Sequence, residues 1–343
     1  MPSFFKSVFI ATVLAFGAVS AQAQSAEEAF FKGKTLRFVV GFGPGGGYDA
    51  YARLIAPYLA KALDATVVVE NQPGAGGMAA LNRIAIAEPD GLRLMIVQGV
   101  GAALAQISNA PGMRYDLATL GHLGTVSASP WMWIAGPNAK FDHPRDVAAL
   151  GRPLLWGGSG PTDGSSDGAS FTCEGLRLKC RIVVGYLGSN DVALAVAKGE
   201  MDSLYLSDTS VKNFVKGAPE LRVVAAMGRQ RSRFFPDVPS IFELMPLDKD
   251  QAWLFDFHST VEDLGRILVT PPNLPQGRLA VLRKAVETAL KNPEIIEEGE
   301  RTQRYIDFVD AQTTRGRVLK VVSDITPDER KLVQTLIGRI EGK

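Results

Sequence analysis

The sequence predicts an α/β fold made of two similar units. From Lys34 onward, short apolar runs alternate with segments in which apolar residues recur at helical spacing. Strands separated by helices imply mostly parallel sheets with right-handed crossovers. The length of 343 residues fits two domains, since one domain takes roughly 100–200 residues. The net charge of +1 and the hydrophobic content of 46% give no indication of a nucleic-acid or membrane-surface partner.

The first 23 residues are typical of a signal peptide. Lys6 precedes a short apolar stretch, 7–19, and Ala21-Gln22-Ala23 fits the small-x-small rule of signal peptidase. The apolar stretch is too short to span about 30 Å of hydrocarbon comfortably. An uncleaved N-terminal anchor is the alternative. We expect cleavage after Ala23 and export of the mature protein.

The first unit is expected to alternate strand and helix. Tyr51 and Leu54 lie on one face of a helix that follows the first strand, and Pro57 is expected to bend this helix or end it early. A second helix is expected at 78–87. The apolar runs that predict strands are 35–42, 65–70, 92–99 and 120–127.

A second α/β unit follows. Trp131 and Trp133 alternate as in a strand, where they either fill a core or stack on a ligand. Helical patterns occur at 167–177 and 190–198. Further strands are predicted at 153–158, 181–186, 202–208 and 221–227.

The C-terminal part is expected to return to the first unit. Residues 231–250 are rich in proline and aromatic side chains, which is typical of a segment that passes between domains. A strand at 265–272 and a helix at 276–292 follow. Thr326 and Glu329 form the capping-box pattern at the start of a last helix.

Glycine-rich turns follow several of the predicted strands. Gly41, Gly43 and Gly46 satisfy G-x-G-x-x-G, and Glu70 ends the next apolar run, as in a dinucleotide-binding unit. However, an exported protein meets little free NAD. Three further turns, 73–77, 157–170 and 186–193, repeat the arrangement of strand, turn and helix.

Such turns have a second use, as a cradle for a small anion. Turns of this kind direct free backbone N–H groups and helix N-termini toward one edge of the sheet. Glycine lets the backbone approach a ligand closely. None of the turns contains Lys or Arg, so we expect main-chain dipoles and hydroxyls to bind the anion. The alternative is that each turn only reverses the chain.

The motifs resemble a known family. "LRFVVGFGPGGGYDAYARLIAPYLAKAL", "VVVENQPGAGG" and "EPDGLRLMIVQG" are together similar to the periplasmic substrate-binding proteins of tripartite tricarboxylate transporters, the Bug family. The resemblance continues through "GSGPTDGSSDGAS" and "ILVTPPNLPQGRLAVLRKAV", and so covers most of the mature chain.

The resemblance implies a type II-like periplasmic-binding-protein architecture. Two domains, each a mixed, mostly parallel sheet flanked by helices, would be joined by two crossing segments and close like a flytrap. Domain 1 is then expected at 24–128 and 228–343, and domain 2 at 129–227. The implied protein is a periplasmic monomer that binds a carboxylate and serves the membrane subunits of a tripartite transporter, or a sensor kinase.

The resemblance also carries ligand-binding roles to particular residues. Asp49 is expected to cap backbone amides instead of touching the anion. The residues expected to contact the ligand lie in the glycine loops and at the strand ends that face the cleft: Phe42, Gly43, Gly45, Gly46, Gly47, Tyr48, Gly74, Ala75, Gly76, Gln98, Ser127, Ser159, Gly160, Thr162, Tyr186, Ser189 and Asp208.

Two departures from the family pattern bear on the ligand. Family members often carry a histidine where this chain has Ser166-Asp167-Gly168, and the loops here add Asp163 and Asp191. If these acids face the cleft, they disfavour a second carboxylate on the ligand, and a monocarboxylate or a ligand with a polar uncharged end fits better. If they face solvent, they have no such effect.

The last expectations concern the two cysteines, metal or cofactor binding, and catalysis. Cys173 and Cys180 are either a disulfide or two buried thiols. With three histidines, none near a cysteine, we expect no metal and no cofactor. No H-E-x-x-H or Walker A motif occurs, and we expect a binding protein. The alternative is a two-domain enzyme that binds a nucleotide through Gly41, Gly43 and Gly46.

Overall fold

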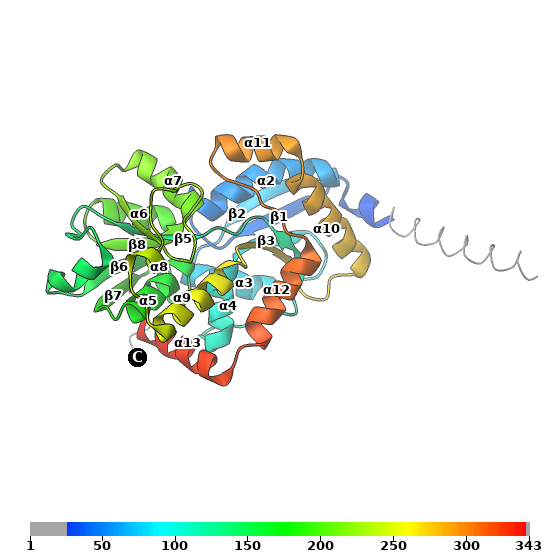
Figure 1. Cartoon of the computed structure of the whole chain (residues 1–343). Helices are drawn as coiled ribbons and strands as arrows, with labels where there is room; N and C mark the ends of the chain where they lie inside the picture. Colours follow the sequence, from blue (N-terminus) through cyan, green and yellow to red (C-terminus); the bar gives the residue numbers. More distant parts are fainter. Residues whose placement is uncertain (1–25, 341–343) are drawn as a thin grey trace, which may run out of the picture.

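The computed structural model describes residues 26–340, which form two lobes (Figure 1). Each lobe is built on a five-stranded sheet with helices on its faces. The predicted α/β class with two sheets is confirmed. The predicted signal peptide lies outside the described residues. Within 26–340, no helix is both long and apolar enough to cross a bilayer.

The first lobe contains the sheet of order β2-β1-β3-β10-β4. β1, β2 and β3 are parallel, and β10 runs antiparallel to both β3 and β4. The strands are β1 (Thr35–Val40), β2 (Thr66–Asn71), β3 (Arg93–Gln98), β4 (Gly121–Thr125) and β10 (Arg266–Thr270). The helices that accompany this sheet are α2 (Gly47–Leu63), α3 (Met78–Ala85), α4 (Gly99–Ser108), α10 (Gln276–Leu290), α11 (Pro293–Arg301) and α12 (Ala311–Ser323).

The second lobe repeats this topology in the order β7-β6-β8-β5-β9. β6 is parallel to β7 and β8, and β5 is antiparallel to β8 and β9. The strands are β5 (Trp131–Ala135), β6 (Leu154–Gly158), β7 (Cys180–Val184), β8 (Ser203–Ser207) and β9 (Arg222–Ala226). The helices are α5 (Gly164–Gly175), α6 (Ser189–Ala197), α7 (Asp208–Gly217), α8 (Ile241–Leu244) and α9 (Lys249–Glu262), with a 3-10 segment at Pro144–Leu150.

The chain crosses between the lobes twice, once after β4 and once before β10. The two crossings lie side by side, because the Arg266 backbone N–H donates to Ser127 O at 2.9 Å and Val126 N–H donates to Arg266 O at 2.8 Å. Gly265 has a φ of +59°, and a Cβ there would collide with the Ser127 carbonyl oxygen. Only glycine fits this position. The hinge therefore places Arg266 at the boundary of the lobes.

Helices α8 and α9 pack with the second lobe, against β9 and α5. The sequence places 228–343 in the first domain, whereas the segment up to Glu262 lies against the second sheet. α9 also contacts α4 of the first lobe. The exact domain boundaries stay a prediction.

Helix α2 does not end at Pro57, contrary to one of the two expectations for this residue. It continues to Leu63. Pro57 is exposed, while Leu59 and Leu63 beyond it are buried in the first lobe's core. Burial of these side chains outweighs the one backbone hydrogen bond that proline removes.

The C-terminal helix α13 (Pro327–Ile340) packs against α4 of the first lobe and α5 of the second (Figure 1, red). Its capping box is present, with Thr326 N–H donating to Glu329 at 2.8 Å. The Ser170 hydroxyl donates to the Leu336 carbonyl at 3.0 Å. Cys173 and Cys180 form a disulfide, which is the first of the two alternatives that the sequence left open. It joins the end of α5 to the start of β7.

Candidate functional site

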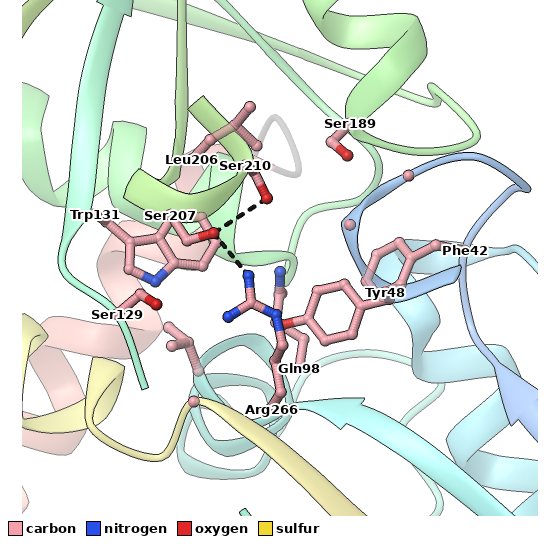
Figure 2. Close-up of a pocket in the computed structure, with 14 residues that line it drawn as sticks. Phe42, Tyr48, Gln98, Ser129, Trp131, Ser189, Leu206, Ser207, Ser210 and Arg266 are labelled. Carbon is pink, nitrogen blue, oxygen red and sulfur yellow. Dashed lines mark hydrogen bonds between the residues drawn. The ribbon is translucent and has the colours of Figure 1, made fainter. Parts of the chain in front are cut away.

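A pocket lies between the two lobes beside the crossing segments (Figure 2). The empty space between its side chains, with open solvent included, is about 580 Å³. Both lobes contribute to its wall. The lining residues are Phe42, Gly46, Gly47, Tyr48, Gln98, Val100, Ser129, Trp131, Ser189, Leu206, Ser207, Ser210, Gly265 and Arg266.

Arg266 provides the positive charge of this pocket. Its side chain is only 4% exposed, and Figure 2 shows its guanidinium among the lining residues, bonded to Ser207. Nη2 donates to Ser207 Oγ at 2.7 Å and to Thr209 Oγ1 at 3.3 Å, and Nη1 donates to Ser127 Oγ at 3.2 Å. Within residues 26–340, Nε has no hydrogen-bond partner.

A buried charge normally has a counter-ion, because taking it out of water is costly. Arg266 is bonded to hydroxyl groups alone, and within 26–340 no carboxylate lies at ion-pair distance from it. Burial raises the pKa of Asp208, and the charge of Arg266 lowers it in part. The Asp208 carboxylate accepts a hydrogen bond from the Ser232 hydroxyl at 2.7 Å and makes no direct contact with Arg266. The pocket is therefore prepared for an anion that this part of the chain does not supply.

Aromatic side chains form the walls around the guanidinium. Phe42 and Tyr48 of the first lobe stack at 4.9 Å between ring centroids. Trp131 of the second lobe stacks on Tyr205 at 5.3 Å. The Tyr51 ring lies 4.5 Å from the guanidinium carbon of Arg266, and the Tyr48 ring 5.5 Å from it. Ligands with flat apolar parts suit such walls.

Tyr48 and Gln98 link the pocket to helix α5. Burial raises the pKa of Tyr48 well above its ordinary value, although Arg266 and a hydrogen bond with Gln98 act in the opposite direction. The Gln98 side-chain oxygen accepts from the backbone N–H of Gly164, the first residue of α5. A Cβ at Gly164 would collide with Trp131, so this helix start lies directly behind the pocket wall.

The predicted glycine loops meet across the lobes in two pairs. In the first pair, Gly43 N–H donates to Leu187 O at 2.9 Å, and a Cβ on Gly46 would lie 3.3 Å from Ser189 Oγ. In the second pair, a Cβ on Gly160 would lie 2.5 Å from the Gly76 nitrogen. The loops therefore face each other across the lobes, and their backbones are in direct contact.

The loop before α5 already holds a carboxylate of its own. Asp163 is 1% exposed and accepts backbone N–H groups from Ser159, Gly160, Ser165 and Ser166. The Ser159 and Gly160 amides, which the sequence assigned to a ligand, thus donate to one carboxylate oxygen of Asp163, while its other oxygen caps α5. Asp191, the other added acid, is exposed.

Six of the residues predicted to bind the ligand line this pocket: Phe42, Gly46, Gly47, Tyr48, Gln98 and Ser189. Gly76 and Thr162 line a smaller neighbouring cavity that shares Phe42 and Gln98. Ser127 lies behind Arg266 as its hydrogen-bond partner. Ligand binding by these residues stays a prediction.

The remaining predicted residues lie outside the pocket. The Gly45 N–H donates to Asp49 at 2.8 Å, so Asp49 holds a loop amide. Gly43, Gly74 and Ala75 shape their loops, and Tyr186 packs on the core of the second lobe. Asp208 begins α7, and its backbone N–H donates to Pro130 O.

Sequence reasoning missed Arg266, Ser207 and Ser210, and for Trp131 it left a place in a core or beside a ligand open. An arginine at the start of an apolar strand was the available signal for Arg266, since a charge rarely begins a fully buried strand without a partner. The glycine motif also has a different role here. Glu70 pairs with Arg37 at 2.9 Å, and a Cβ on Gly41 would meet the Gly77 backbone at 2.8 Å.

Comparison with known proteins decides the family. The family model described as "Tripartite tricarboxylate transporter family receptor" matches residues 51–334. The chain belongs to this receptor family. The resemblance inferred from the glycine-loop motifs is thereby confirmed. Members of the family are transporter binding proteins, and its solved relatives include periplasmic ones.

Individual relatives of this receptor are distant in sequence. A UPF0065 protein of Bordetella pertussis is 25% identical over 282 residues, which cover 80% of this chain and 82% of the relative. Protein BugT of the same organism is 25% identical over 244 residues, 69% of this chain and 72% of BugT.

Solved structures share the receptor's fold. The periplasmic binding protein BugD superposes with a TM-score of 0.73 at 19% identity, covering 88% of this chain and 97% of BugD. MatC of Rhodopseudomonas palustris, solved with bound malate, gives a TM-score of 0.70 at 21% identity, covering 90% of this chain and 98% of MatC. A second R. palustris protein, solved with adipate, gives 0.72 at 19% identity, covering 89% and 97%.

Proposed function

We propose that this protein is an extracytoplasmic receptor that captures a small organic acid in the pocket between its lobes. It then delivers the acid to the membrane subunits of a tripartite transporter, or presents its closed form to a sensor kinase. The observation that carries the proposal is the buried guanidinium of Arg266, which faces an interlobe pocket and has hydroxyl partners but no carboxylate partner within residues 26–340.

Charge and position both support an acid as the ligand. A desolvated arginine stabilises a carboxylate strongly, through charge-assisted hydrogen bonds. Because Arg266 begins β10 directly after the second crossing, a ligand bound to it contacts the hinge and both lobes at once. Malate and adipate in two structures of this fold are carboxylates as well.

A thermal-shift series tests the proposal. The purified protein is melted with benzoate, hexanoate, malate and adipate, and with NAD as the probe of the nucleotide alternative. A bound acid at 100 times its Kd adds about 2.7 kcal/mol to the free energy of unfolding, so at least one acid should raise Tm by several degrees. A rise with NAD and with none of the acids would contradict the proposal.

A further inference from the structure

Among the described residues that line the receptor's pocket, Arg266 is the only one with a charged side chain. The amide donors at the start of α5 are filled by Asp163 and lie behind Trp131 and Gln98.

The free donor of Arg266 fixes where that anion would bind. Among residues 26–340 the buried Nε finds no partner, and the adjacent Nη2 donates to Ser207 and Thr209. A carboxylate along the Nε–Nη2 edge satisfies Nε and replaces the hydroxyl oxygens at Nη2. The hydroxyls it displaces can then donate to the same carboxylate, and a bidentate arginine–carboxylate pair results.

The rest of the pocket suits an uncharged, flat body. Its walls are the Phe42–Tyr48 stack on one side and Trp131 and Leu206 on the other. A second carboxylate on the ligand would find no second cationic side chain among the described residues that line the pocket. It would therefore be desolvated without a charged partner.

We propose that the ligand is a monocarboxylate with a flat apolar body, its carboxylate on Arg266 and its body between the Tyr48 and Trp131 walls. This inference rests on the proposed function and narrows its substrate class. Malate and adipate, the acids bound by two proteins of this fold, each have two carboxylates and therefore fit this pocket less well.

Isothermal titration calorimetry on the full protein tests this class. Benzoate and phenylacetate are the monocarboxylate probes, benzamide is the uncharged isostere of benzoate, and malate and adipate are the dicarboxylates. We expect the aromatic acids to bind at least tenfold more tightly than benzamide and than either dicarboxylate. Benzamide binding as tightly as benzoate, or a dicarboxylate binding more tightly than both aromatic acids, would overturn the inference.

Arg266→Gln removes the charge and leaves a shorter, neutral polar side chain. Benzoate affinity should fall about 10- to 100-fold, the loss expected for one charge-assisted hydrogen-bonded pair. Arg283→Gln is the control, because Arg283 donates to the His122 backbone oxygen and does not line the pocket. Unchanged benzoate affinity in a folded Arg266→Gln protein would overturn the inference that the ligand's carboxylate binds Arg266.

The outcomes separate the two proposals. Tight dicarboxylate binding that depends on Arg266 refutes the monocarboxylate class and leaves the organic-acid receptor standing. An absence of binding by every acid, with the melting curve of a folded protein, refutes both.

Discussion

His258 of α9 lies buried between two carboxylates. Its Nδ1 is 3.0 Å from Glu262 and its Nε2 is 3.3 Å from Asp167, and the Tyr205 hydroxyl donates to Glu262 at 2.7 Å. Burial alone would lower the pKa of His258, but the charges and hydrogen bonds of Glu262 and Asp167 raise it to about 9. The imidazole is therefore protonated at neutral pH and ties α9 to α5.

This cluster predicts a loss of stability in alkali. A histidine whose pKa is about 9 in the folded protein and about 6.5 in the unfolded chain contributes its full stabilisation below pH 6.5. That contribution is lost as the pH rises through 9. Urea unfolding at intervals from pH 7 to 9 should show the free energy of unfolding fall by roughly 1–3 kcal/mol.

His258→Gln should flatten this decline, whereas His143→Gln, at the N-cap of a 3-10 segment, should leave it unchanged. Two other groups with shifted pKa values titrate below the range of pH 7 to 9. His122 has its pKa lowered to about 4 by burial, and Asp167 has its pKa raised to about 6 by burial. An equal decline in the wild type and in His258→Gln would contradict the prediction.

Single residues of the site were only partly predictable from the sequence. Phe42 and Gln98 lie at the ends of predicted strands and Tyr48 lies just beyond one, and their place in the pocket follows from these positions. Arg266 was not predicted, because its contacts with Ser127 and Ser207 join residues far apart in the chain. The occupation of the α5 amides by Asp163 depends on a side-chain direction that sequence spacing does not reveal.

At the scale of elements, helical glycines differ in the room around them. Gly316 lies exposed within α12, and a Cβ there would have no neighbour within 4 Å. Gly299 is buried in α11, where a Cβ would lie 2.5 Å from the Arg304 carbonyl oxygen. The chain turns sharply as it leaves α11, and the Arg304 N–H donates a hydrogen bond to Gly299 O.

The two glycines predict opposite effects of the same substitution. Gly316→Ala should raise the free energy of unfolding by about 0.5–1 kcal/mol, because alanine has less freedom to lose in the unfolded chain. Gly299→Ala should lower it by roughly 1–3 kcal/mol, because the methyl group overpacks the turn. Urea unfolding measures both, and a stabilising Gly299→Ala would contradict the close contact.

All of the predicted strands are present, with boundaries that differ by one or two residues at most ends. Their apolar runs and flanking glycines are local signals. Helix α4 was not predicted, because it is buried on nearly every side and so lacks an amphipathic pattern. Helix α9 was missed because the proline-rich segment before it obscured its start, although Asp248 and Gln251 form a capping box there.

At the scale of the whole molecule, small residues let the two lobes approach. A Cβ on Gly101, in the first turn of α4, would collide with the Thr162 carbonyl oxygen of the second lobe and lie 3.1 Å from Asp163 Cα. Gly160 and Gly76 meet in the same region. The closed arrangement therefore depends on the absence of side chains at this seam.

Gly101→Ala should hold the lobes apart. We expect a larger radius of gyration by small-angle X-ray scattering and weaker binding of any acid that the wild type binds, because the pocket wall comes from both lobes. Far-UV circular dichroism should stay unchanged, since alanine favours helix. Gly316→Ala, far from the seam, serves as the control. A scattering curve identical to that of the wild type would show that the seam adapts locally.

Helix α13 adds a third connection to the two crossing segments. Arg330 donates to Ile107 O of the first lobe at 2.9 Å, while Arg339 pairs with Glu174 and Leu336 O accepts from Ser170 in the second. If the lobes swing apart, this helix must peel away from one of them or bend with both. Opening the pocket therefore costs the free energy of these α13 contacts in addition to the rotation at the hinge.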